Sequence, residues 1–241
     1  MNKICLIHHP IGIGDIFFLQ YIGRKYLELG YKVIWPIRSD IFWIKDYVPD
    51  ITFCLPEDNF PGKEYYGQDL IIQSPQFVYL GIMRAHLWEN DYQIGNNTCS
   101  IMKSKYSLLN LDWNRWNEGF IFNRNLEKEN DLYYNVLGLK DNTEYVFWNN
   151  MASVDTRTCD VIDNLKFNYQ KIILRYIDGY SLLDWCKVLE NATEIHTVHT
   201  GVNYVIDKLN IKANVYDMYQ GLHSLEVQHI PFVKKPKFIP N

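Results

Sequence analysis

Residues 4–19 constrain the fold more than any other part of this sequence. The stretch reads Ile-Cys-Leu-Ile-His, then His-Pro-Ile-Gly-Ile-Gly, then Asp-Ile-Phe-Phe-Leu. Branched apolar residues, then glycines, then a helical pattern predict a buried strand, a tight turn and a helix. Ligands bind at the carboxyl ends of the strands in open α/β sheets, so this turn is a predicted ligand site.

The rest of the chain repeats the strand–helix alternation in two series. In the first we expect strands at 4–8, 32–37, 51–55 and 70–73, helices at 15–29, 40–47, 79–89, from 104 and at 127–137, and an irregular stretch at 112–118. In the second we expect strands at 145–148, 171–176, 194–198 and 213–216, helices at 180–190 and 202–209, and an extended tail at 231–241. The pattern predicts an α/β protein with two Rossmann-like lobes facing a cleft, residues 1–140 and 141–241.

Composition excludes several classes of protein. The net charge is −4 and only 234–237 is locally basic, which argues against nucleic acid as a partner. No apolar run approaches the roughly 20 residues that a transmembrane helix needs. The five cysteines show no CxxC spacing, and a strand is expected from residue 4, so we expect no secretory signal and a cytoplasmic location.

The glycine turn lacks the features of a dinucleotide site. That fingerprint has a third glycine or alanine, where this chain has Phe17, and an acid closing the second strand. Here the second strand runs into Arg38, and the nearest acid, Asp40, comes late. A nicotinamide-dependent oxidoreductase is therefore disfavoured but stays an alternative.

Asp15 has two interpretations. An acid in the first turn of a helix interacts favourably with the helix dipole and needs no further role. The same carboxylate, at the ligand edge of a sheet, is also placed to act as a general base toward a hydroxyl. His8 and His9 follow the same strand, and one of them is placed to hydrogen-bond Asp15 or a substrate.

A second turn of the same form lies at residues 197–204, Thr-Val-His-Thr-Gly-Val-Asn-Tyr. A strand there leads through small residues into a helix. Backbone N–H groups of such a turn, with the Thr200 hydroxyl, form an anion site suited to a diphosphate. The alternative is an ordinary turn in which Thr200 is the N-cap.

Together, the two turns resemble the paired motifs of the lipopolysaccharide heptosyltransferases, whose members have the GT-B fold. The resemblance implies that Asp15 is the catalytic base, that Gly12 and Gly14 let the acceptor and donor phosphates approach the backbone, and that Thr200 and Gly201 hold the donor diphosphate. His9 is assigned to the acceptor side.

The chain departs from that family at two positions of the second turn. His199 stands where the family has Asp, and Tyr204 where it has His. Both positions contact the donor in the family, so the resemblance implies a different nucleotide sugar or a loss of transfer. Asn203, in the same turn, is a further donor-side candidate.

No Asp-x-Asp motif is present, and His196 and His199 have no further ligand at metal-site spacing, so we expect no metal. A GT-B enzyme instead stabilises its leaving diphosphate with helix N-termini and basic side chains. The candidates are Arg175, Arg157 and the amides of the loop around Asn150.

The sequence thus predicts a metal-independent glycosyltransferase that needs no bound cofactor. It would move a sugar from a nucleotide-diphosphate donor, its co-substrate, to a glycan hydroxyl, with inversion. The alternative from another class is a non-catalytic module that binds a glycan or a nucleotide sugar. The donor sugar, its nucleotide, the acceptor and the oligomeric state stay open.

Overall fold

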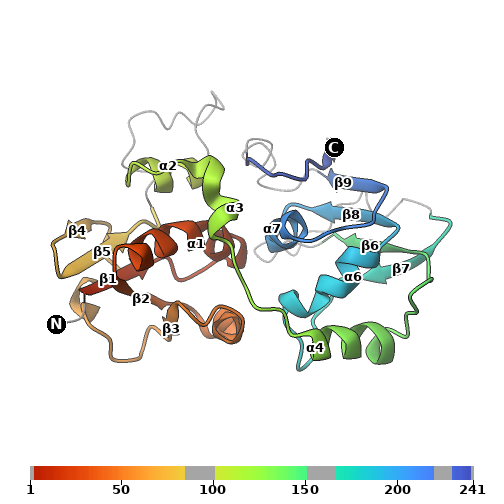
Figure 1. The fold of residues 1–241 in the computed structure, drawn as a ribbon, viewed down its shortest axis with the longest axis horizontal. Helices are drawn as coiled ribbons and strands as arrows, with labels where there is room; N and C mark the ends of the chain where they lie inside the picture. The colour runs from red at the N-terminus through yellow and green to blue at the C-terminus, as the bar shows by residue number, and fades with distance from the viewer. Residues whose placement is uncertain (1–2, 85–100, 151–166, 220–229, 240–241) are drawn as a thin grey trace. The chain divides into compact units, whose positions relative to one another are not determined.

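The computed structural model describes residues 3–84, 101–150, 167–219 and 230–239 of the chain (Figure 1). The chain divides into two compact units. The first unit is Met1–Asn123 with His229–Pro231, and the second is Arg124–Gln228 with Phe232–Asn241. The division falls at Asn123, whereas the sequence placed its boundary at 140, so the helix that begins at Leu126 belongs to the second unit.

The first unit alternates strands with helices and short helical turns. Its elements are β1 (Lys3–His8), α1 (Ile13–Glu28), β2 (Tyr31–Pro36), η1 (Ser39–Asp46), β3 (Thr52–Cys54), η2 (Lys63–Tyr65), β4 (Ile71–Gln73), β5 (Phe77–Gly81), α2 (Ile101–Ser107), η4 (Trp113–Arg115) and α3 (Trp116–Gly119). Gly30 ends the first helix as expected, at a positive φ of 80°.

Two expectations for this unit were wrong. The helix expected from Tyr79 begins instead as strand β5, which lies between β1 and β4. The run from Phe77 to Gly81 is aromatic and branched, and four of its five residues are buried, as a central strand requires. The stretch 112–118 is helical rather than irregular, with Asp112 accepting from the Asn114 N–H at its start.

The first sheet has the order β3-β2-β1-β5-β4. All pairs are parallel except β4 with β5, which is antiparallel, so the sheet is mixed at this edge. Strand order reverses between β1 and β5, which makes this the switch point of the sheet, the place where ligands bind in open α/β folds.

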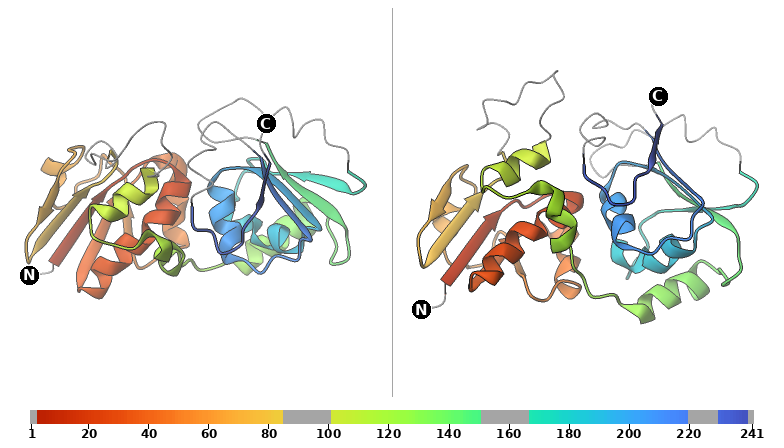
Figure 2. Two further views of the ribbon diagram at one scale, coloured as in Figure 1. Left: turned by 90° about the horizontal axis from the view of Figure 1, so that it is seen from above. Right: turned by 45° about the horizontal axis from the view of Figure 1, so that its top comes forward.

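Different layers cover the two faces of the first sheet. Helix α1 packs on one face, where Gly23 lies against Ile7 and Val33, and α3 approaches α1 so closely that a Cβ at Gly119 would fall 2.1 Å from the Tyr21 Cα (Figure 2). The other face is covered by the irregular segment that contains η2. Its Phe60 completes a buried cluster with one residue each from β1, β2 and β5, namely Leu6, Ile34 and Tyr79.

The second unit contains α4 (Leu126–Asn130), a π-helical turn η5 (Asp131–Val136), β6 (Tyr145–Asn149), β7 (Gln170–Ile173), η6 (Leu182–Trp185), α6 (Cys186–Asn191), β8 (Glu194–Val198), α7 (Gly201–Lys208), β9 (Val215–Tyr219) and β10 (Lys237–Ile239). Its sheet is parallel throughout, in the order β10-β9-β8-β6-β7. The strand order reverses between β6 and β8, which is the switch point of this unit. Phe147 packs against Trp185, and Tyr145 donates to the Val188 carbonyl, so η6 and α6 lie on one face.

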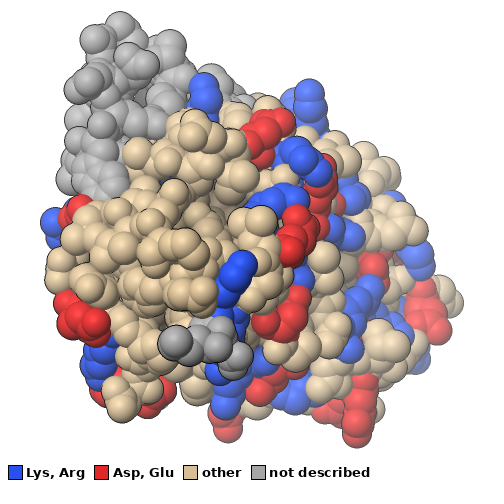
Figure 3. All heavy atoms as spheres, turned by 60° about the vertical axis from the view of Figure 1, so that its left-hand side comes forward, with Lys and Arg blue, Asp and Glu red and all other residues tan. Residues whose placement is uncertain are grey.

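No helix in the described part of the chain is long and apolar enough to cross a membrane. The face of the molecule in Figure 3 mixes acidic and basic side chains without a continuous basic patch.

Candidate functional site

The strongest candidate site lies at the carboxyl ends of β1 and β5, the switch point of the first unit. The two strands end side by side, with His8 paired to Gly81. His8 and His9 point to opposite faces of the sheet because side chains alternate along a strand. Each histidine therefore meets a different set of charged residues.

Asp15 lies in the first turn of α1, directly after this edge. Gly12 is the N-cap of the helix, at φ 81° and ψ 97°, a conformation that glycine adopts with little strain. A Cβ at Gly12 would fall 2.5 Å from Asp15 Oδ2, so the turn requires glycine for a second reason. The missing side chain makes room for the carboxylate at the mouth of the turn, and the Asp15 side chain stays 34% exposed.

A buried lysine pairs with this carboxylate. Lys105 of α2 is 2% exposed in its side chain, and its Nζ donates to Asp15 Oδ1 at 2.6 Å. Helix α2 is held against α1 by the next residue, Tyr106, which donates to the Phe18 carbonyl and packs edge-on against the Phe18 ring. Lys105 was absent from the expectations, because nothing near it in the sequence marks it out.

His9 completes the cluster. Its Nε2 lies 2.7 Å from Lys105 Nζ and 3.4 Å from Asp15 Oδ1. Burial and the neighbouring ammonium lower the pKa of His9 to about 3, with Asp15 acting in the opposite direction. The imidazole is therefore neutral at physiological pH, and its Nε2 accepts a hydrogen bond from Lys105. The indole N–H of Trp35, a residue of β2, donates to the His9 carbonyl and holds the backbone of His9 in place.

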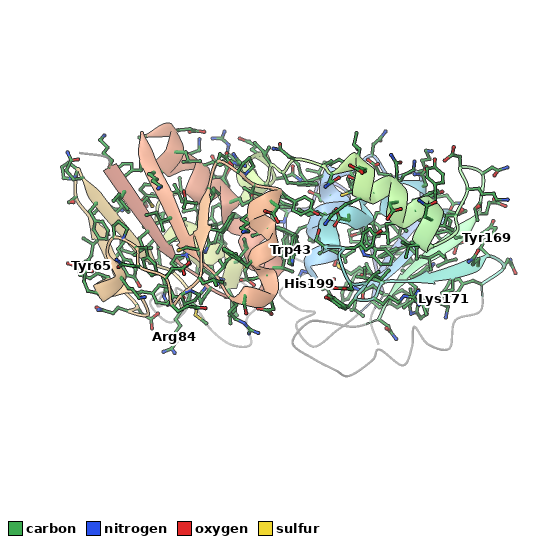
Figure 4. All side chains as sticks on the ribbon, turned by 90° about the horizontal axis from the view of Figure 1, so that it is seen from below. Trp43, Tyr65, Arg84, Tyr169, Lys171 and His199 are labelled. Carbon is green, nitrogen blue, oxygen red and sulfur yellow. The ribbon has the colours of Figure 1, made fainter. Side chains whose placement is uncertain are left out.

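His8 faces the other side of the sheet. It packs edge-on against the Tyr66 ring at 4.7 Å, and its pKa is lowered by burial, with Asp69 raising it and Arg84 lowering it. Asp69 and Arg84 form an ion pair of 3.5 Å, in which the Arg84 side chain is 63% exposed and projects outward (Figure 4). The two histidines thus differ in the cation beside them: Lys105 beside His9 is buried, and Arg84 beside His8 is exposed.

The predicted turn of the second unit lies at its own switch point. Thr200 is the N-cap of α7, where its hydroxyl accepts from the Val202 N–H and the Asn203 side chain accepts from the Thr200 N–H in return. Asn149, at the end of β6, donates to the hydroxyls of Thr197 and Thr200. Both carboxyl-terminal strand ends of this switch point are therefore joined by neutral hydrogen bonds.

The other donor-side candidates are placed as follows. Gly201 opens α7, and the His199 ring packs edge-on against the Tyr204 ring at a centroid distance of 5.8 Å, so the two residues that depart from the heptosyltransferase pattern contact each other. Arg175 is exposed beyond the end of β7, and Asn150 follows β6. Arg157 lies outside the described residues.

The described residues contain no group of three or more histidine, cysteine or acidic side chains placed to hold a metal ion. Gly12, Gly14, Asp15 and His9 belong to the first unit. The candidates on the donor side belong to the second. The structure thus brings together His9 and Asp15, and separately Thr200 and Asn203.

The chain is similar in fold to solved glycosyltransferase structures. It matches the glycosyl transferase family 9 protein from Veillonella parvula DSM 2008 with a TM-score of 0.54 and 9% identity, over 100% of this chain and 87% of that one. It also matches TibC from enterotoxigenic E. coli H10407, described as an iron-containing dodecameric glycosyltransferase, with a TM-score of 0.51 and 10% identity, over 99% of this chain and 62% of TibC. The sequence matches no protein-family model and no curated protein. The predicted α/β class with two Rossmann-like lobes of GT-B type is confirmed.

Proposed function

We propose that this protein is a glycosyltransferase in which Asp15 is the general base. The observation that carries the proposal is the Asp15 carboxylate, which stands at the switch point of the first unit, one-third exposed and paired with a buried cation. The fold shared with known glycosyltransferases supports the same class of reaction. The donor would be a nucleotide-diphosphate sugar and the acceptor a glycan hydroxyl.

The proposed reaction is a single displacement with inversion. Asp15 takes the proton from the acceptor hydroxyl as its oxygen attacks the anomeric carbon of the donor sugar. The bond from that carbon to the diphosphate oxygen breaks, and its electron pair leaves with the diphosphate. The proton stays on Asp15 until solvent removes it, which restores the carboxylate.

The donor diphosphate is assigned to the second unit. Thr200, Gly201 and Asn203 open helix α7, whose N-terminus carries the positive end of the helix dipole. The Asn149 amide beside Thr200 adds a neutral donor at the same strand end. His199, Asn150, Arg175 and Arg157 are proposed to complete the donor side, and the reaction is proposed to need no metal.

Transfer and hydrolysis assays with UDP-, GDP-, ADP- and CMP-sugars test the proposal. For the donor that turns over, Asp15→Asn should lower the transfer rate by about 10²–10⁴-fold, the usual contribution of a general base. Asp50→Asn is the matched control, because it removes a carboxylate that pairs with Arg24, a basic residue on the helix that also carries Asp15. It should retain the wild-type rate.

Two outcomes would contradict the proposal. Full transfer by Asp15→Asn would remove the base assignment. A nucleotide sugar that binds the wild-type protein without any turnover would favour the non-catalytic binding module instead.

A further inference from the structure

Lys105 is a buried lysine whose ammonium group is surrounded by hydrogen-bond acceptors. Its side chain is 2% exposed, and its Nζ atom has three polar or sulfur contacts within 3.6 Å. Nζ lies 2.6 Å from Asp15 Oδ1, 2.7 Å from His9 Nε2 and 3.6 Å from Met102 Sδ. An ammonium group has three N–H donors, and three acceptors surround this one.

Burying a charged lysine side chain lowers the stability of a protein unless its partners compensate the lost hydration. Removing an ammonium group from water costs several kcal/mol, which an ion pair offsets only when its geometry is good. An apolar side chain of similar volume, such as methionine, would often fill the same space at no loss of stability. The carboxylate that compensates this cation is Asp15, the residue proposed to do the chemistry.

Resting on the proposed function, we propose that Lys105 is the positioning residue of the Asp15 base. It binds one carboxylate oxygen, Oδ1, and so restricts the rotation of the group. The other oxygen, Oδ2, lies beside the space that a Gly12 side chain would fill. Lys105 thereby directs Oδ2 toward the mouth of the glycine turn, where an acceptor hydroxyl would approach.

The same contact holds Asp15 in the form that the reaction needs. An adjacent cation favours the charged state of a carboxyl group. Asp15 then stays ionised, and ready to accept a proton, to lower pH than it would alone. After the transfer Lys105 faces a neutral acid without its ion pair, which drives the proton off Asp15 and resets the base.

His9 serves this pair as a neutral acceptor. It takes the second N–H of Lys105 and so stops the ammonium from rotating away from Asp15. An imidazolium at this place would have no lone pair to offer and would repel Lys105. The titratable groups that act on this cluster are Asp15, Lys105, His9 and, across the sheet, His8.

Titration of the Asp15 carboxyl carbon by NMR tests the proposal without any substrate, with the resonance assigned by its absence in Asp15→Asn. In Lys105→Met the midpoint should move to higher pH by about 1–3 units, the usual effect of a nearby opposite charge. Lys105→Arg should return it toward the wild-type value. Lys25→Met, which removes a half-buried lysine paired with Glu28 on the last turn of α1, should leave the Asp15 midpoint unchanged.

A second measurement uses the wild-type protein, so that it holds even if Lys105→Met fails to fold. The Cε resonance of Lys105, assigned with Lys105→Arg, should shift at the pH where Asp15 titrates. An Asp15 midpoint unmoved in a folded Lys105→Met variant, or a Cε resonance without that shift, would overturn the proposal.

The transfer assay separates this inference from the proposed function. The acidic limb of the pH–rate profile of the Lys105→Met variant should move to higher pH by about the same 1–3 units as its Asp15 midpoint. Coupled titrations together with full transfer by Asp15→Asn would remove the proposed function and leave the Lys105–Asp15 coupling standing. Uncoupled titrations together with loss of transfer in Asp15→Asn would do the reverse.

Discussion

The two units both place polar side chains at the switch points of their sheets, but the pair in the first unit is charged and the pair in the second is neutral. In the first unit the switch point holds Lys105 and Asp15, a charged pair with the cation buried. In the second it holds Asn149 and Thr200, an amide and a hydroxyl that are both neutral. A charged pair in a low-dielectric site controls where a proton goes, whereas neutral dipoles at a helix N-terminus suit an anion that does not change charge. The contrast supports assigning proton transfer to the first unit and diphosphate binding to the second.

The largest expected effect comes from acidifying the first site. The folded pKa of His9, about 3, lies below its ordinary value of 6.5. The unfolded chain therefore takes up the proton first, and the contribution of His9 to stability is complete above pH 6.5 and is lost as pH falls toward 3. The free energy of unfolding should fall by about 1.4 kcal/mol per pH unit in that window relative to His9→Gln. Urea unfolding at a series of pH values measures this free energy. If it falls equally steeply with acidification in both proteins, the imidazole is not neutral in the folded state.

The glycine turn gives the next largest effect. Gly12 and Gly30 have nearly the same φ, 81° and 80°, but a Cβ at Gly30 would meet no atom within 4 Å. Each alanine variant should lose about 1–3 kcal/mol of stability from backbone strain. Only Gly12→Ala must also push Asp15 Oδ2 away from its place, and only this variant should lose transfer activity. Equal activity of the two variants would show that the position of Asp15 is not critical.

Removing the Thr200 hydroxyl tests the neutral site of the second unit. Thr200→Val loses the N-cap and the acceptor of Asn149, so the free energy of unfolding should fall by about 1–2 kcal/mol. Thr200→Ser keeps the hydroxyl and should stay within about 0.5 kcal/mol of the wild type. Denaturant unfolding measures both, and equal losses would show that the methyl group matters rather than the cap.

The most specific effect, on ligand binding rather than on stability, is expected from Asn203→Asp. A carboxylate keeps the hydrogen bond to the Thr200 N–H, and the Tyr216 hydroxyl, which accepts from the Asn203 amide in the wild type, can donate to it instead. The same charge would repel a diphosphate bound there. Binding of UDP, GDP or ADP, measured by calorimetry, should weaken at least about tenfold, since one added like charge at close range costs more than 1.4 kcal/mol. Unchanged binding of a nucleotide that the wild type binds would place the donor elsewhere.

The frame of the fold could be predicted from the sequence because its strands are short, buried and closed by turn residues. The expected strands at 4–8 and 194–198 match β1 and β8 closely. Strand β5 was mistaken for the start of a helix, because a fully buried strand shows no alternation of polar and apolar residues. The antiparallel pairing of β4 depends on that strand and could not be inferred without it.

The candidate site was predictable only in part. Asp15 and the glycine turn carry a local pattern, and the expected neighbourhood of His9 and Asp15 follows from one strand leading into one helix. Lys105 carries no such pattern. Its role depends on the docking of α2 through Tyr106 onto α1, a tertiary contact that spacing along the chain does not encode.

The long sequence separation within the Asp15 cluster has a consequence for how the first unit folds. Lys105 is 90 residues from Asp15 and 96 from His9, whereas α1 and β2 follow β1 directly. Contacts between distant residues form against the entropy of closing a long loop, so local pairs form sooner. Until Lys105 arrives, a folding chain would hold β1 and α1 in place with the Asp15 carboxylate still hydrated. The Asp15 site is thus assembled late in folding. In native-state hydrogen exchange the amides of α2 should therefore exchange at lower denaturant concentration than those of β1.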